Sequence, residues 1–190
     1  MQGMAVPRLT DARKELRRAQ ITEAAVRCFS RNGLERTSIA DITAESGLST
    51  GSIYAHYRNK SELVRASAHS VLAERAEALG EYAASSTPPD PDELLARLIA
   101  GIDPIKARVA VQTWGEATNN PAIHGIVVET IDGMRAMVHE SVTAWLVKVE
   151  HLEPAEAQQH ATAIAHRVQS LYLAQLLHTA LQSPDEETAP

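Results

Sequence analysis

The chain has 190 residues, of which 44% are apolar and 22% charged, a composition that can bury a core and predicts a folded protein. Its single cysteine, Cys28, excludes a disulfide framework and a cysteine-based zinc site within one chain, and favours a reducing compartment. The sequence has no apolar run of about 18 residues, and its beginning is too charged for a secretory signal. We therefore expect a cytoplasmic protein that is not embedded in a membrane.

The net charge of −6 is unevenly distributed along the chain. Residues 1–65 carry 11 Lys and Arg against 7 Asp and Glu, a balance of +4, whereas the other 125 residues carry 7 against 17, a balance of −10. This asymmetry predicts a basic N-terminal module on an acidic body. A basic helix face can also be a solvated surface without a partner, so charge alone does not identify a ligand.

Apolar spacing predicts helices along the chain and no strand. In the first predicted helix, Asp11 to Asn32, the apolar residues Ile21 and Cys28 keep the helical interval, and Gly33 ends the helix. Two short helices follow, and then a long one to about Ala84. Their start signals are a capping box of Ser38 and Asp41, a cap at Ser49 or Thr50, and the pair Asn59 and Glu62.

The second half of the chain is predicted to be helical as well. SSTPPDPDE is its linker-like stretch, and its last two helices are expected over about 121–149 and 154–182. Proline is favoured at the first position of a helix because its missing N–H would have had no partner inside the helix. The pairs that give this signal are Asp90-Pro91, Asp103-Pro104, Asn120-Pro121 and Glu153-Pro154.

The stretch from Thr37 to Lys60 has the spacing of a helix-turn-helix. Ile39 and Ile42 on one short helix and Ile53 on the next would hold the pair at a fixed angle around Gly47. The second helix would then present short hydroxyl side chains, a glycine and a tyrosine to a DNA major groove. The alternative is a helical hairpin without a ligand, in which Tyr54 and Tyr57 are core aromatics.

Residues 13–66 resemble the N-terminal domain of the TetR family of bacterial transcriptional regulators. The matching segments are RRAQITEAAVRCFSRNG, TSIADITAESGLS and TGSIYAHYRNKSEL, in the family's order and spacing. The resemblance implies an all-α homodimer without a cofactor. It also implies a three-helix DNA-binding domain and a helical ligand-binding and dimerisation domain. The polar C-terminal segment SPDEETAP predicts a disordered tail. We place these at residues 1–58, with a flexible arm at 1–10, and at 59–183 and 184–190.

The family's DNA contacts fall on nine positions of this chain. Thr50 stands where many members have lysine, which would weaken one contact, and Thr43 stands where alanine is common. The hydroxyl of Thr43 can bond back to the preceding turn. By position, the expected contacts are Thr37, Ser49, Thr50, Gly51, Ser52, Tyr54, His56, Tyr57 and Lys60.

The last helix contains VQSLYLAQLLHTAL, which is apolar nearly all the way round. Such a helix is buried on two sides, and we expect one side to meet a symmetry-related copy. The apolar positions are Val168, Leu171, Leu173, Leu176, Leu177 and Leu181. The alternative is a wholly internal helix of a monomer. A dimer would read a near-palindromic operator with half-sites roughly 34 Å apart, one turn of DNA.

An effector cavity is expected in the C-terminal domain, where AVQTWGEATNNPAI also resembles a stretch of many family members. Aromatic and methionine side chains suit an adaptable apolar pocket. The candidates are Tyr82, Trp114, Met134, Met137 and Tyr172, and each could also be an ordinary core residue. Polar contacts could come from His69, His139, His166, Glu116 or Gln175.

Patterns typical of enzymes are incomplete. His139-Glu140 begins like a zinc-protease motif, but Thr143 stands where the second histidine is required. Glu156 and His160 share a helix face without a matching pair on another helix. We therefore expect no catalysis and no metal. The expected function is a repressor that a largely apolar small molecule releases from DNA. The alternatives are an activator, a regulator controlled by a protein partner, and a helical-bundle enzyme with a DNA tether.

Overall fold

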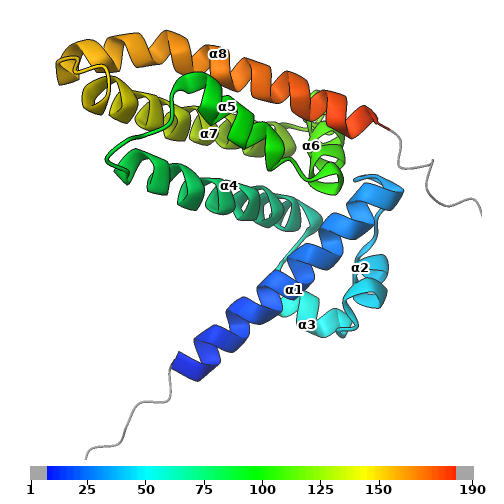
Figure 1. Cartoon of the computed structure of the whole chain (residues 1–190). Helices are drawn as coiled ribbons and strands as arrows, with labels where there is room; N and C mark the ends of the chain where they lie inside the picture. Colours follow the sequence, from blue (N-terminus) through cyan, green and yellow to red (C-terminus); the bar gives the residue numbers. More distant parts are fainter. Residues whose placement is uncertain (1–7, 183–190) are drawn as a thin grey trace, which may run out of the picture. The chain divides into compact units, whose positions relative to one another are not determined.

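The computed structural model describes residues 8–182, and over this range the chain forms eight α-helices and no strand (Figure 1). The prediction of an all-α fold is confirmed. None of these helices is long and apolar enough to cross a membrane. The helices are α1 (Arg8–Asn32), α2 (Ile39–Ser46), α3 (Thr50–His56), α4 (Lys60–Ala84), α5 (Pro91–Ala100), α6 (Pro104–Ala117), α7 (Pro121–Lys148) and α8 (Pro154–Leu181).

Two compact units divide the chain between Ser67 and Ala68, inside α4. The first unit contains α1 to α3 and the start of α4, and the second contains the rest of α4 and α5 to α8. Because α1 begins at Arg8, the last part of the predicted arm at residues 1–10 is helical. The rest of that arm and the predicted tail at 184–190 lie outside the described residues.

The helix end predicted at Gly33 is confirmed, and the turn predicted around Gly47 ends α2 in the same way. Gly33 and Gly47 have φ of 84° and 67°, the left-handed region that glycine enters without a steric penalty. The N–H of Gly33 donates to the carbonyl of Phe29 at 2.9 Å, and the N–H of Gly47 donates to that of Thr43 at 3.1 Å. Each glycine thus closes its helix and redirects the chain toward the next one.

The predicted caps of the first unit are also present. The N–H of Asp41 donates to the Ser38 hydroxyl at 3.2 Å, and the N–H of Ser38 donates to the Asp41 carboxylate at 2.8 Å. Ser49 accepts from the N–H of Ser52 at 3.2 Å at the start of α3. At the start of α4, the side-chain oxygen of Asn59 accepts from the N–H of Glu62 at 2.9 Å.

Proline occupies the first turn of α5 to α8, as predicted. Asp90, Asp103 and Asn120 cap the first three of these helices through their side chains, whereas Glu153 makes no such bond to α8. Glutamate is one carbon longer than the residues that cap well, so the start of α8 depends on proline and on packing.

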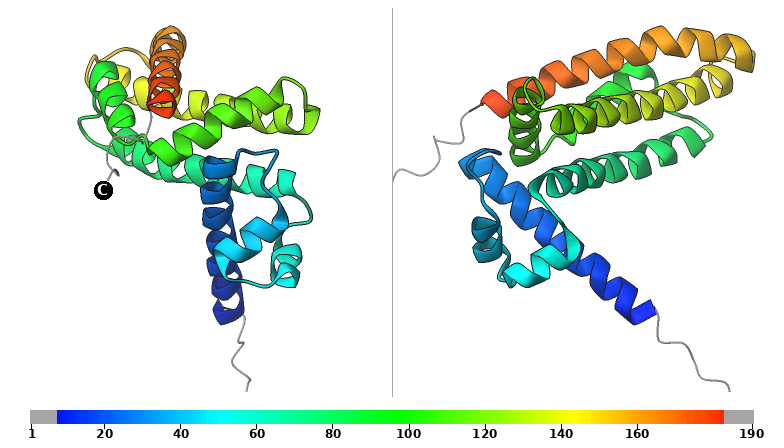
Figure 2. Two further views of the ribbon diagram at one scale, coloured as in Figure 1. Left: turned by 90° about the vertical axis from the view of Figure 1, so that its right-hand side faces the viewer. Right: turned by 180° about the vertical axis from the view of Figure 1, so that it is seen from behind.

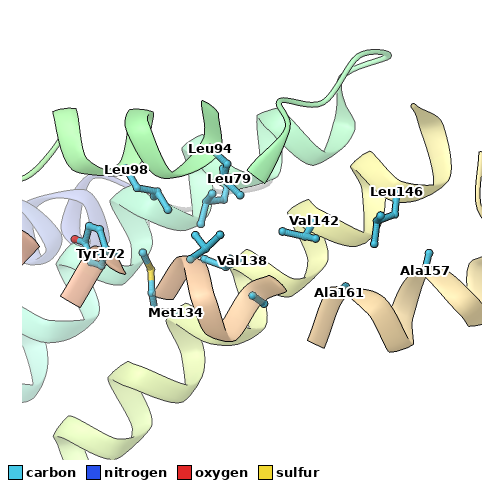
Figure 3. Packing of buried hydrophobic residues seen from close by; sticks show 12 residues of the cluster. Leu79, Leu94, Leu98, Met134, Val138, Val142, Leu146, Ala157, Ala161 and Tyr172 are labelled. Atoms are coloured by element: carbon cyan, nitrogen blue, oxygen red, sulfur yellow. The ribbon is translucent and has the colours of Figure 1, made fainter. Parts of the chain in front are cut away.

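The core of the second unit lies where α4, α5, α7 and α8 meet (Figure 3). α7 and α8 run side by side along their length (Figures 1 and 2). Ala157, Ala161 and Ala165 are buried on successive turns of α8, and such small side chains let the two helices approach closely. Val138 and Val142 of α7 fill this cluster and are at most 1% exposed.

Lys148 of α7 closes the C-terminal end of α4. Its ammonium donates to the carbonyls of Ala83 and Ser85 at 2.8 Å each and to that of Ala84 at 3.3 Å. The last carbonyls of a helix have no partner inside the helix and carry partial negative charge, so a cation is favourable there. The end of α4 is therefore fixed to α7.

We predict that Ser38→Ala lowers the free energy of unfolding of the first unit by roughly 0.5–2 kcal/mol, because it removes the side-chain cap of α2. Both tryptophans, Trp114 and Trp145, lie in the second unit, so their fluorescence reports on that unit alone. Urea unfolding followed by circular dichroism should shift to lower urea, while the tryptophan transition should stay in place. Unchanged transitions by both probes would contradict the role of this cap.

This effect should also depend on pH. Hydrogen bonds from the Ser38 N–H, and then from its hydroxyl, hold the pKa of Asp41 below its ordinary value of 3.8. A carboxylate with a depressed pKa in the folded state stabilises the fold fully above its ordinary pKa and loses that contribution as the pH falls through its folded pKa. The difference in the free energy of unfolding between the wild type and Ser38→Ala should therefore become smaller as the pH drops below 3.8.

Candidate nucleic-acid interface

One face of α3 is free of the rest of its unit. Thr50, Gly51 and Ala55 are exposed, and the side chain of Tyr54 is 53% exposed. Ile53 points the other way and is fully buried. A helix with short hydroxyls, a glycine and one projecting tyrosine on its free face has room to approach a DNA groove closely.

Tyr57, directly after α3, lies in the core and not on this face. It is 3% exposed, and its hydroxyl shares a hydrogen bond of 2.9 Å with the hydroxyl of Thr22. The Tyr57 hydroxyl also donates to the carbonyl of Arg18 at 3.4 Å. The structure thus gives the phenol of Tyr57, one of the predicted DNA contacts, two partners on α1.

α1 closes the C-terminal ends of both short helices. The guanidinium of Arg18 lies 4.7 Å from the ring centre of Tyr57 and donates to the carbonyl of His56 at 3.3 Å. The amide of Gln20 donates to the carbonyl of Ser46 at 2.9 Å. Neither Arg18 nor Gln20 was among the predicted site residues. Both lie within one turn before Ile21, the first buried position, and side chains at such positions can reach neighbouring helices.

Lys60, another of the predicted DNA contacts, makes its hydrogen bonds within the first unit. Its ammonium donates to the carbonyls of Leu34 and Glu35 at 2.8 and 3.0 Å, and reaches that of Thr37 at 3.5 Å. These contacts occupy its donors and hold the loop between α1 and α2 against the start of α4.

Thr37 belongs to the same loop. Its side chain is 2% exposed, and its hydroxyl contacts the carbonyls of Gly33 at 2.8 Å and Cys28 at 3.2 Å. The hydroxyl therefore fixes the entry to α2 from inside the unit. Among the nine predicted DNA contacts, the three whose side chains donate to backbone carbonyls of the unit are Thr37, Tyr57 and Lys60.

The other predicted contacts lie at or near the surface. Ser49, Thr50, Gly51 and Tyr54 are exposed, whereas Ser52 and His56 are half-buried at the edge of the α3 face. The hydroxyl of Thr50 lies 3.3 Å from that of Thr43.

Two more residues lie on α2 and beside α3. Thr43 also donates back to the carbonyl of Ile39 at 2.8 Å, as predicted. Arg58, exposed directly after α3, was absent from the predicted set, although a cation in that place can meet a phosphate.

Ion pairs fix α2 to α1. Glu45 accepts from Arg27 at 2.6 Å and also pairs with Arg31. The hydrogen bonds from Arg27 and then Arg31 hold the pKa of the Glu45 carboxyl below its ordinary range, so it is ionised at neutral pH. The α2–α3 pair is thus attached to α1 through apolar packing, two capping side chains and this ion-pair cluster.

Most of the predicted effector residues lie in one part of the second unit. Met134 and Tyr172 belong to its core cluster, and Tyr82 and Met137 pack against that cluster while partly exposed. Arg97 lies over the ring of Tyr82, 4.8 Å from its centre. Trp114 is half-buried on α6 and is not part of this cluster. Over the described residues, no group of three or more metal-binding side chains occurs.

We predict that Lys60→Met destabilises the first unit by roughly 1–3 kcal/mol, because it leaves loop carbonyls without a donor. Urea unfolding followed by circular dichroism measures the change, with tryptophan fluorescence as the probe of the second unit. Lys14→Met is the matched control, since Lys14 is exposed on α1. A Lys60→Met protein as stable as this control would contradict the structural role.

Comparison with known proteins places the first unit in a family. Residues 21–67 match the model of the N-terminal domain of "Bacterial regulatory proteins, tetR family". The regulator TtgR of Pseudomonas putida is 53% identical over 49 residues, a match that spans 26% of this chain and 23% of TtgR. The regulator BetI of Burkholderia thailandensis is 24% identical over 165 residues, covering 84% of this chain and 82% of BetI.

Solved structures show the same fold over most of the chain. A TetR transcription regulator from Haloarcula marismortui has a TM-score of 0.62 at 17% identity, covering 87% of this chain and 95% of that one. FadR of Bacillus subtilis, in complex with stearoyl-CoA, has a TM-score of 0.54 at 19% identity and covers 85% and 92%. The family model and the helix-turn-helix geometry agree that the first unit carries the DNA-binding domain of TetR-family transcriptional regulators, and the solved structures share the fold over most of the chain.

Proposed function

We propose that the chain is a repressor that binds a near-palindromic operator as a homodimer and is released by a small-molecule effector bound in its second unit. The observation that carries this proposal is the free face of α3, which is held from behind by α1. A DNA-binding regulator of a bacterial chromosome works in the cytoplasm, where we place it.

The free face offers two kinds of DNA contact. Tyr54, Thr50 and Ser49 can approach base edges in the major groove, where hydroxyl groups both donate and accept. His56 and Arg58 lie at the C-terminal end of the helix and can meet phosphates. The side chains proposed to contact bases and those proposed to contact phosphates therefore lie on different parts of the segment from Ser49 to Arg58.

An apolar face of α8 supports dimerisation. Val168 is buried in the core, but Leu171, Leu177 and Leu181 are 48%, 41% and 71% exposed. The helix is thus not wholly internal, and its outward face carries leucines that a second copy would cover. Two copies around a two-fold axis would present two α3 helices to half-sites about one DNA turn, roughly 34 Å, apart.

The effector site is proposed around the cluster that holds Met134 and Tyr172, with Tyr82, Met137 and Trp114 as further contacts. Methionine and tyrosine side chains adapt to apolar ligands and can also offer a hydroxyl. Over the described residues, Oε1 of Gln112 on α6 is a buried side-chain atom without a hydrogen-bond partner. Leaving a buried acceptor unpaired costs roughly 1–3 kcal/mol, so a ligand donor would be favourable there.

Release from DNA is proposed to run through α4, which is one continuous helix across the boundary between the units. Its first residue, Lys60, holds the α1–α2 loop, and its last carbonyls are held by Lys148 of α7. An effector that binds better to one position of α4 would shift the population of DNA-competent molecules. That FadR binds stearoyl-CoA on the same fold supports an effector with a large apolar part.

We predict that the purified protein enriches one near-palindromic sequence from a pool of random duplexes. The half-sites should be centred about 10 base pairs apart, and affinity should fall steeply as salt rises, because phosphate contacts release counterions. Sequencing of the bound fraction at two salt concentrations measures both properties.

Leu177→Glu is the control for the dimer, because a carboxylate on the outward face of α8 would oppose pairing. This variant should sediment as a monomer and lose at least tenfold in operator affinity, with an unchanged circular dichroism spectrum. Weak, uniform binding of every duplex by the wild-type protein would overturn the proposed function.

A further inference from the structure

The N-terminal part of α1 extends beyond the helices that it supports. Its first buried residue is Ile21, so the helix runs through the residues from Asp11 to Gln20 with side chains that are exposed, apart from a half-buried Arg18. Figures 1 and 2 show this end of α1, in dark blue, projecting past α2 and α3. Packing therefore does not explain why the chain keeps about three helical turns here.

The cations of this extension continue the buried stripe of α1. Lys14 and Arg17 lie seven residues before Ile21 and Ala24, which are fully buried, and Arg18 lies seven before Ala25. Seven residues are close to two helical turns, so each pair shares a face of the helix. The face of α1 that packs on α2 and α3 thus becomes a cationic stripe once it passes their ends.

This stripe begins beside α3. It consists of Arg13, Lys14, Arg17 and Arg18. Arg18 donates to the carbonyl of His56, the last residue of α3, at 3.3 Å. Arg13, Lys14 and Arg17 are exposed, and none takes part in the ion pairs found among the described residues. Arg17 donates to the side-chain oxygen of Gln20 at 3.0 Å. The acids Asp11 and Glu15 do not cancel the charge of these four cations.

We propose that this stripe is a second DNA-binding element, which contacts phosphates adjoining the half-site that α3 reads. The proposal rests on the proposed function, because it needs α3 in the major groove. Arg13, Lys14 and Arg17 are exposed and lie outside the ion pairs of the described residues, so they are complementary to a phosphate backbone, while Arg18 joins the stripe to the end of α3. From Arg18 to Arg13 the helix rises about 8 Å, which matches about two base pairs at 3.4 Å each.

The test compares Lys14→Gln/Arg17→Gln with the wild-type protein on the selected operator and on a scrambled duplex of equal length. Phosphate contacts carry no sequence information, so both duplexes should lose affinity by the same factor, at least tenfold near 0.15 M salt. The slope of log affinity against log salt should flatten by about 0.9 for each phosphate lost. Ethylation interference should show phosphates that matter to the wild type and not to the variant.

Asp11→Asn/Glu15→Gln is the matched control, with the same number of changes on the same turns. It should keep the salt slope and the interference pattern of the wild type. If the wild type selects an operator but Lys14→Gln/Arg17→Gln shares its slope and pattern, the inference about α1 is wrong and the proposed function stands. A loss confined to the operator duplex would also overturn it, since that result indicates base readout. If the wild type selects no site, the proposed function itself fails.

Discussion

The burial of Tyr57 against α1 is the constraint on which the proposed DNA-reading surface depends. α3 has only 7 residues, too few for a helix to persist without tertiary contacts. Ile53 and Tyr57 attach it from behind, and Arg18 holds both the ring of Tyr57 and the last carbonyl of the helix. The opposite face, with Thr50 and Tyr54, can then be presented in a fixed orientation. Preorganisation of this kind lowers the entropy lost when a protein binds DNA.

Local signals predicted the elements well because each depends on a few adjacent residues. Gly33 and Gly47 end helices through their own φ angles, and Ser38 and Asp41 form their capping box within one turn. The roles of Tyr57 and Lys60 could not be predicted in the same way. Both follow α3, the helix proposed to bind DNA. Whether they face DNA or the fold depends on α1 and on the loop between α1 and α2, which lie far away in sequence. Hydroxyl and ammonium groups suit either environment.

In the second unit too, local signals predicted the helices but not the contacts between distant residues. Proline after Asp90, Asp103 and Asn120 marks the starts of α5, α6 and α7. The buried alanines of α8 explain how that helix packs, but they were not needed to predict that it forms. Sequence could not say which leucines of α8 face outward, because an all-round apolar helix has no distinctive periodicity. The contacts of Lys148 with the end of α4 likewise join residues more than sixty positions apart. This anchoring fixes the C-terminal end of α4, the helix through which release from DNA is proposed to run.

The most direct test of this account removes one hydroxyl at a time from two tyrosines only three positions apart. Tyr57→Phe should lower the free energy of unfolding of the first unit by about 1 kcal/mol, because its hydroxyl bonds inside the fold. Tyr54→Phe should leave stability unchanged and lower affinity for the selected operator more than for scrambled DNA. Urea unfolding and operator titration of both variants measure the difference. A Tyr54→Phe protein that is destabilised, beside a Tyr57→Phe protein that only loses operator affinity, would contradict the account.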